Sequence, residues 1–140
     1  WDTRLLEVFP DIEIHPGYQN VTLEQLLSHT AGLPPFTDTD EEDEDLVVMM
    51  DVYDVAPKEH RSRLLPAVLA REPKVAPGTQ FLYSNMGYVV AGAMLEHLTQ
   101  TPFETLIVRE LFTPLGMTSA GFGAAGTPGQ VDEPWGHRPE

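Results

Sequence analysis

Residues 77–88 read Pro-Gly-Thr-Gln-Phe-Leu-Tyr-Ser-Asn-Met-Gly-Tyr. The Pro-Gly pair predicts a tight turn, and a short extended piece follows it. A strongly apolar helix then begins at Ser84 or Asn85 and runs to about Thr99. Tyr83 and Asn85 are therefore expected at a helix N-terminus, where unpaired N–H groups and a positive potential favour a phenolate and orient a polar substrate.

The remaining pattern is mainly helical. Thr22 and Gln25 form a capping-box pattern, so a helix is expected from there to about His29. Two more helices are expected over residues 46–53 and over residues 61–71, and Pro66 is expected to open a second part of the latter. A further helix is expected from Thr101-Pro102 onward, and its inward-facing side chains are Phe103, Leu106, Ile107 and Leu111. At most, short strands are expected at 81–83 and 121–122.

Three segments, in order, resemble the serine β-lactamase and penicillin-binding-protein superfamily. They are Pro77-Gly78-Thr79-x-Phe81-x-Tyr83-Ser84-Asn85-x-Gly87-Tyr88, residues 21–34 (VTLEQLLSHTAGLP) and residues 111–117 (LFTPLGM). The first is similar to the Tyr-x-Asn signature of class C β-lactamases, D-alanyl-D-alanine carboxypeptidases and related esterases. The other two resemble the helix and turn before the central subdomain and the close of the helix pair after the signature.

The resemblance implies that residues 1–140 are a single partial domain. It would be the mainly α, helical subdomain of a β-lactamase-like fold, which also has an α/β domain, and few short strands are expected. In that family the active site lies between the two parts. Residues 36–45 are expected to be an acidic loop and residues 124–140 a loop or tail. A trimmed chain with a disordered tail is the alternative to an internal fragment.

Two groups that the family uses are missing from the sequence. The only lysines, Lys58 and Lys74, follow Val55 and Arg71 by three residues, so no Ser-x-x-Lys nucleophile is present. No Lys-Thr-Gly or His-x-Gly strand is found either, because the His-Thr-Ala-Gly at 29–32 closes a helix. We therefore expect the isolated chain to be inactive and the parent protein to be a serine hydrolase.

The resemblance gives the two site residues their roles. Tyr83 would be the base partner of the missing serine, Asn85 would orient the substrate, and Ser84 would face away and cap the helix. The parent would cleave a β-lactam, a D-Ala-D-Ala peptide or a carboxylic ester through an acyl-serine, with no cofactor and no metal. In the simpler structural interpretation, Tyr83 only packs and Asn85 only caps. The alternative function is a non-catalytic helical binding module derived from that family.

Composition excludes several classes. There are no cysteines, so disulfides and thiolate metal sites are excluded, and a net charge of -14 argues against nucleic-acid binding. The longest apolar stretch, 88–95, is too short to span a bilayer. The resemblance implies a periplasmic or extracellular location, and a cytoplasmic one stays open.

Two groups of ionisable residues are candidates for metal sites. Residues 38–45 hold seven carboxylates in eight positions, but they lack the glycine of a calcium loop, so a solvated loop is favoured. The five histidines match no metal spacing. His29 is interpreted as structural, with its ring bonding free carbonyls at a helix C-terminus.

The expected partners follow from these interpretations. They are a small ester or amide substrate in the parent enzyme and the missing α/β domain of the same protein. The long helix is apolar over more than one stripe, which suits contact on two sides. An isolated copy is therefore expected to expose an apolar face and to form a homodimer.

Overall fold

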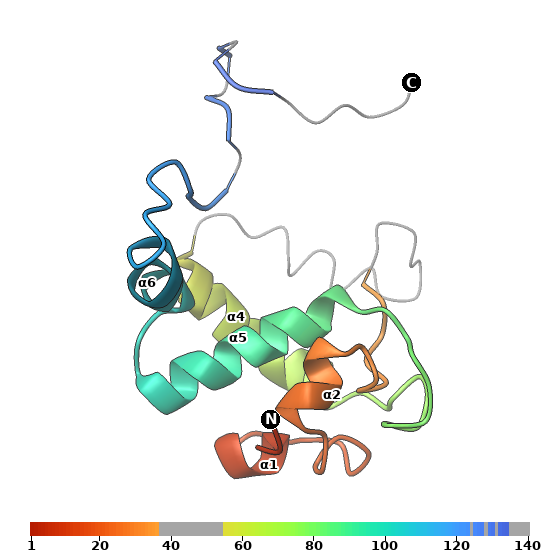
Figure 1. Cartoon of the computed structure of the whole chain (residues 1–140). Helices are drawn as coiled ribbons and strands as arrows, with labels where there is room; N and C mark the ends of the chain where they lie inside the picture. Colours follow the sequence, from red (N-terminus) through yellow and green to blue (C-terminus); the bar gives the residue numbers. More distant parts are fainter. Residues whose placement is uncertain (37–54, 124, 128, 131, 135–140) are drawn as a thin grey trace, which may run out of the picture. The chain divides into compact units, whose positions relative to one another are not determined.

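The computed structural model describes residues 1–36, 55–123, 125–127, 129–130 and 132–134. The acidic run 38–45 and the expected helix 46–53 lie outside the described residues. The elements are α1 (Leu5–Val8), α2 (Leu23–Leu27), α4 (Pro57–Leu69), α5 (Asn85–Thr99), α6 (Phe103–Ile107) and the π-helix η2 (Val108–Phe112) (Figure 1). The chain divides into two compact units, Trp1–Phe103 and Glu104–Glu140.

Helix α5 is the centre of the first unit, and its bounds agree with the sequence prediction. It packs against α4, α2 and α1. Its buried face is apolar, because Met86, Val90 and Met94 are at most 1% exposed. The core around this face also contains Leu5, Val8, Phe9, Tyr18, Val21, Leu26, Leu33, Leu65, Val68 and Leu69.

The capping box of α2 is confirmed. The Thr22 hydroxyl accepts a hydrogen bond from the Gln25 N–H at 3.3 Å, and the Gln25 side-chain oxygen accepts one from the Thr22 N–H at 3.1 Å. The helix ends at Leu27 rather than near His29. His29 has φ 57°, a left-handed conformation that cannot continue a right-handed helix.

The expected start of the next helix at residue 61 is wrong, because α4 begins at Pro57. Proline suits the first helical position, where its missing N–H leaves no bond unmade. Pro66 lies inside this helix and does not open a second one. Burial of four apolar side chains against the core keeps the helix continuous, and these are Leu64, Leu65, Val68 and Leu69.

Two further expectations are wrong in part. Helix α6 begins at Phe103 and buries Leu106 as expected, but Leu111 is 42% exposed in η2. Within the described residues, the segments 81–83 and 121–122 are not strands, and an isolated antiparallel bridge joins Arg4 to Thr22. Segment 81–83 instead bonds to the irregular chain after α2, through the Leu82 N–H.

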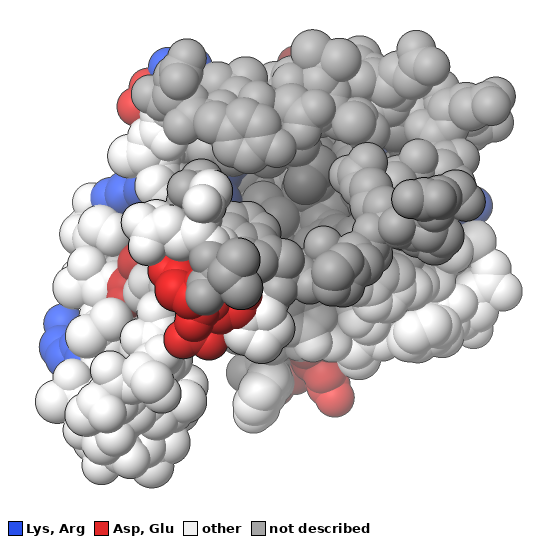
Figure 2. All heavy atoms as spheres, turned by 90° about the horizontal axis from the view of Figure 1, so that it is seen from above, with Lys and Arg blue, Asp and Glu red and all other residues white. Residues whose placement is uncertain are grey.

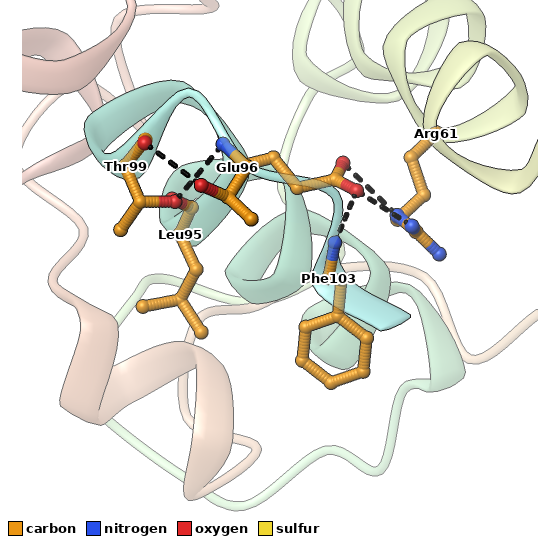
Figure 3. A network of polar contacts seen from close by, with 6 residues as sticks. Arg61, Leu95, Glu96, Thr99 and Phe103 are labelled. Atoms are coloured by element: carbon orange, nitrogen blue, oxygen red, sulfur yellow. Dashed lines mark hydrogen bonds and ion pairs between the residues drawn. The ribbon is translucent and has the colours of Figure 1, made fainter. Parts of the chain in front are cut away.

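An ion pair between the partly buried Arg61 and the buried Glu96 joins α4 to α5 (Figure 3). Arg61 donates to the Glu96 carboxylate at 2.7 and 3.1 Å, and the Phe103 N–H donates to it at 2.8 Å. Burial opposes the charge of Glu96, but the hydrogen bonds from Arg61 and Phe103 and the charges of Arg61 and Lys58 outweigh it. Together they lower the pKa of Glu96 below its ordinary value of 4.5.

Within the described ranges no helix has both the length and the apolar character needed to cross a bilayer. The same residues contain no cluster of three or more His, Asp or Glu side chains placed to hold a metal ion. On the face drawn in Figure 2, the described Lys and Arg atoms are scattered and form no continuous patch.

Acid should weaken the first unit through Glu96. Because the folded-state pKa is lowered, the contribution of this carboxylate is fully present above about pH 4.5 and is lost as pH falls through the lower folded value. We expect Glu96→Gln to lower the free energy of unfolding at neutral pH by roughly 1.5–3 kcal/mol and to flatten its fall below pH 5. Urea melts over this pH range measure both effects. Glu59→Gln, in an exposed pair with Arg63, is the control. An equal pH slope for Glu96→Gln and wild type would refute this account.

Gly87 allows α5 to approach α2. A Cβ at this position would lie 2.7 Å from the Leu26 carbonyl oxygen, which is backbone and cannot move aside. Gly→Ala inside a helix usually stabilises, but here we expect Gly87→Ala to cost about 1–3 kcal/mol. Thermal melts check this, with Gly121→Ala as the control because its Cβ would meet nothing within 4 Å. A stabilised Gly87→Ala variant would contradict the packing.

Candidate active site

The chain that leads into α5 is held beside the chain that leaves α2 (Figure 1). The Gly78 N–H donates to the Thr30 carbonyl at 2.7 Å, and the Leu82 N–H donates to the His29 carbonyl at 2.8 Å. The Asn85 N–H closes the series by donating to the Pro35 carbonyl at 3.1 Å. Gly78 has φ 78°, which a glycine adopts freely, so the predicted turn is present. These bonds fix the backbone on both sides of Tyr83.

Ser84 caps α5, as the sequence predicts. Its hydroxyl accepts from the Met86 N–H at 3.2 Å and donates to the Pro34 carbonyl at 2.6 Å. The side chain is only 2% exposed. With extended backbone at Ser84, its two neighbours must point the other way, toward solvent.

Tyr83 and Asn85 meet on that exposed side. The Tyr83 hydroxyl donates to Asn85 Oδ1 at 2.8 Å, and Asn85 Nδ2 donates to the Phe36 carbonyl at 2.9 Å. Because the Phe36 carbonyl can only accept, it orients the amide so that its oxygen faces Tyr83. The oxygen of the Asn85 amide keeps one further lone pair, and its nitrogen keeps one further N–H. Tyr83 is 49% exposed, so a polar molecule can reach the pair.

The sequence predicts that the helix runs to about His29 and that the His29 ring bonds free carbonyls, but α2 ends at Leu27 and the ring has another partner. The Nδ1 atom of the His29 ring does not bond a carbonyl. It accepts a hydrogen bond from the Ser84 N–H at 3.2 Å. The ring also lies against three aromatic rings, with centroid distances of 4.6 Å to Tyr83, 5.4 Å to Tyr88 and 5.6 Å to Phe81. One signal in the sequence could have indicated the position of His29. Histidine tolerates left-handed backbone better than most residues, and His29 follows shortly after the end of α2.

Phe36 was also missed. Its φ of 52° is unusual for a bulky residue and costs on the order of 1–3 kcal/mol. This conformation accompanies the carbonyl contact to Asn85. No local pattern in the sequence marks it, because its partner lies 49 positions away.

A groove of about 700 Å³ lies elsewhere on the first unit, among α2, α4 and α5. Its lining is mostly apolar and includes Trp1, Leu23, Leu27, Leu64, Leu95 and Phe103. Trp1 is 75% exposed and Leu95 is 38% exposed, so the groove presents large apolar side chains to water. Such a surface is typical of a face that contacts another protein part.

Comparisons with known proteins agree with this architecture. The family model described as Beta-lactamase matches residues 1–139. The chain is similar to protein flp of Staphylococcus aureus (strain NCTC 8325 / PS 47), with 30% identity over 116 residues. That match covers 81% of this chain and 21% of the relative, so the chain spans about a fifth of the relative's length.

Two solved structures are similar in fold. The D-stereospecific amidohydrolase from Streptomyces sp. matches with TM-score 0.62 and 26% identity, covering 84% of this chain and 35% of that one. The octameric penicillin-binding protein homologue from Pyrococcus abyssi matches with TM-score 0.57 and 26% identity, covering 81% of this chain and 25% of that one. The chain therefore belongs to the beta-lactamase family, and it corresponds to a mainly helical part of that fold.

Proposed function

We propose that this chain forms one wall of the active site of a longer hydrolase, which cleaves an amide or ester through an acyl-serine intermediate. The observation that carries the proposal is the 2.8 Å hydrogen bond between the Tyr83 hydroxyl and Asn85 Oδ1 on an exposed face. The chain has no Ser-x-x-Lys serine, so the nucleophile would lie outside these residues. Membership of the beta-lactamase family supports the reaction class.

Tyr83 would accept and return protons. In the first step, its phenolate takes the proton of the serine hydroxyl while the serine oxygen attacks the substrate carbonyl carbon. The tetrahedral intermediate then collapses, the bond to nitrogen or oxygen breaks, and the phenol returns the proton to the leaving group. In the second step, the phenolate takes a proton from water while the water oxygen attacks the acyl carbon. The bond from that carbon to the serine oxygen then breaks, the phenol returns the proton to the serine, and the carboxylic acid leaves. Tyr83 lies in the extended segment directly before Ser84, the N-cap of α5, so its side chain is held at the start of that helix.

Asn85 would position the substrate. Its amide is oriented by the Phe36 carbonyl, and this contact is the same whether or not Tyr83 carries its proton, so the amide needs little reorganisation when substrate arrives. The free N–H of Nδ2 and the free lone pair of Oδ1 would bond the amide or ester group beside the scissile bond. This arrangement holds the carbonyl close to the same proton acceptor that activates the serine.

The relatives favour an amide as the scissile bond. One similar structure is named a D-stereospecific amidohydrolase, and another is a penicillin-binding protein homologue. β-Lactams and carboxylic esters undergo the same two acyl-transfer steps, so they are suitable probes. The runner-up function, a non-catalytic binding module, is supported by the apolar groove.

Removing the phenol should abolish most turnover in the longest gene product that carries this chain. With nitrocefin and p-nitrophenyl butyrate as substrates, we expect Tyr83→Phe to lower kcat on the order of 10²- to 10⁴-fold, because the group proposed to move the serine proton is lost. Tyr88→Phe is the matched control, since it removes the hydroxyl of a second exposed tyrosine, which lies on α5, and keeps its ring. Equal turnover by Tyr83→Phe and wild type would exclude Tyr83 as the base. No turnover by the wild type would favour the binding module.

The 140-residue chain alone should be inert toward the same substrates. It contains the proposed base and orienting group but no Ser-x-x-Lys nucleophile, and a tyrosine alone forms no acyl-enzyme at an appreciable rate. Hydrolysis is measured at high protein concentration against a buffer blank. Turnover above the blank that is lost in Tyr83→Phe would show that the nucleophile lies within this chain.

The apolar groove should cause the isolated chain to self-associate. In the longer protein we propose that it contacts the remaining part of the fold; in the isolated chain a second copy would cover it. Because the net charge of -14 opposes association, the dimer fraction should rise between low and moderate salt. Sedimentation velocity measures this. Leu95→Gln, in the groove, should weaken the dimer, whereas Leu98→Gln, an exposed leucine of the same helix that is not part of the lining, should not. A monomer at both salt concentrations would contradict the groove's role.

A further inference from the structure

We propose that His29 is a positioning residue for Tyr83: it holds the backbone on both sides of the tyrosine and supports its ring. The proposal rests on the proposed function for the catalytic meaning of Tyr83, but its structural content can be tested separately. The histidine comes from the turn after α2, and the tyrosine precedes α5, so the contact joins two segments that are far apart in the sequence.

The first support is the backbone on either side of Tyr83. The residue before it, Leu82, donates its N–H to the His29 carbonyl at 2.8 Å. The residue after it, Ser84, donates its N–H to His29 Nδ1 at 3.2 Å. One residue therefore accepts hydrogen bonds from both neighbours of Tyr83, and this fixes the direction in which the Tyr83 side chain leaves the backbone.

The second support is the ring of His29. Its centroid lies 4.6 Å from that of Tyr83, with 41° between the ring planes. Tyr83 is about half exposed, so without this neighbour little would restrict the swing of its side chain. Tyr88 and Phe81 contact the same imidazole at 5.4 and 5.6 Å, which holds the imidazole itself in place. The ring thus helps to keep the Tyr83 hydroxyl within reach of Asn85.

The third support is the chemistry that the position demands. The φ of 57° favours Gly, Asn, Asp or His, the ring contact requires an aromatic side chain, and the Ser84 N–H requires a side-chain acceptor. Histidine meets all three conditions. Asparagine offers the backbone and an acceptor without the ring, and phenylalanine offers the ring without the acceptor. The two substitutions therefore separate the two contributions.

The experiment uses the longest gene product that carries this chain, with ¹⁵N-labelled serine and ¹³C-labelled tyrosine for NMR. We expect His29→Phe to speed amide exchange at Ser84 at least about tenfold, because its acceptor is lost. We expect His29→Asn to shift the Tyr83 ring resonances, because the imidazole ring current is lost, while Ser84 stays protected. His97→Asn is the matched control, since that histidine contacts Phe9 and not Tyr83. Unchanged Ser84 exchange and unchanged Tyr83 resonances in both variants would overturn the proposal.

Kinetics separate positioning from simple stabilisation. If the proposed function holds, His29→Asn should lower kcat on the order of 10- to 100-fold with KM within about threefold, at a temperature where the variant is fully folded. A purely structural role would leave kcat per folded molecule unchanged, and that result would reject the positioning role. If the wild type shows no turnover, the proposed function fails, and the NMR measurements alone still decide whether His29 holds Tyr83.

Discussion

The buried hydroxyl of Ser84 is the interaction on which the site depends. A buried hydroxyl is costly unless it is hydrogen-bonded, and this one both donates to the Pro34 carbonyl and accepts from the Met86 N–H. Because Ser84 must face inward, the alternation of an extended segment turns its two neighbours outward. The juxtaposition of Tyr83 and Asn85 is thus a consequence of how α5 is capped.

The surrounding packing makes this cap possible. Gly87, in the first turn of α5, lets the helix lie directly on the Leu26 carbonyl. The turn after α2 is then close enough for His29 to bond the chain on both sides of Tyr83. His29 and Phe36 adopt left-handed backbone conformations, which are unfavourable for residues other than glycine, and both residues contact the site. Strained conformations are retained where the surrounding structure enforces them, which is common near functional groups.

Two helix caps of this fold could be predicted from the sequence, whereas the contacts between distant segments could not. The N-cap of α5 at Ser84 and the capping box at Thr22 follow from contacts within a few residues, which side-chain type encodes directly. The contact between His29 and Ser84 spans 55 positions and depends on how two helices pack. The inward-facing prediction for Leu111 failed for a related reason, because a helical stripe shows only which side chains are apolar, and packing decides which are buried.

The central claim is that Tyr83 activates a serine that lies outside these 140 residues. Intact-mass spectrometry of the longest gene product, quenched at short times after mixing with a β-lactam or a p-nitrophenyl ester, tests it most directly. The account predicts a mass increase of one acyl group, mapped by peptide analysis to a serine outside this chain, and much slower formation of the adduct in Tyr83→Phe. An adduct on a residue within this chain, or equally fast acylation without the phenol, would contradict it.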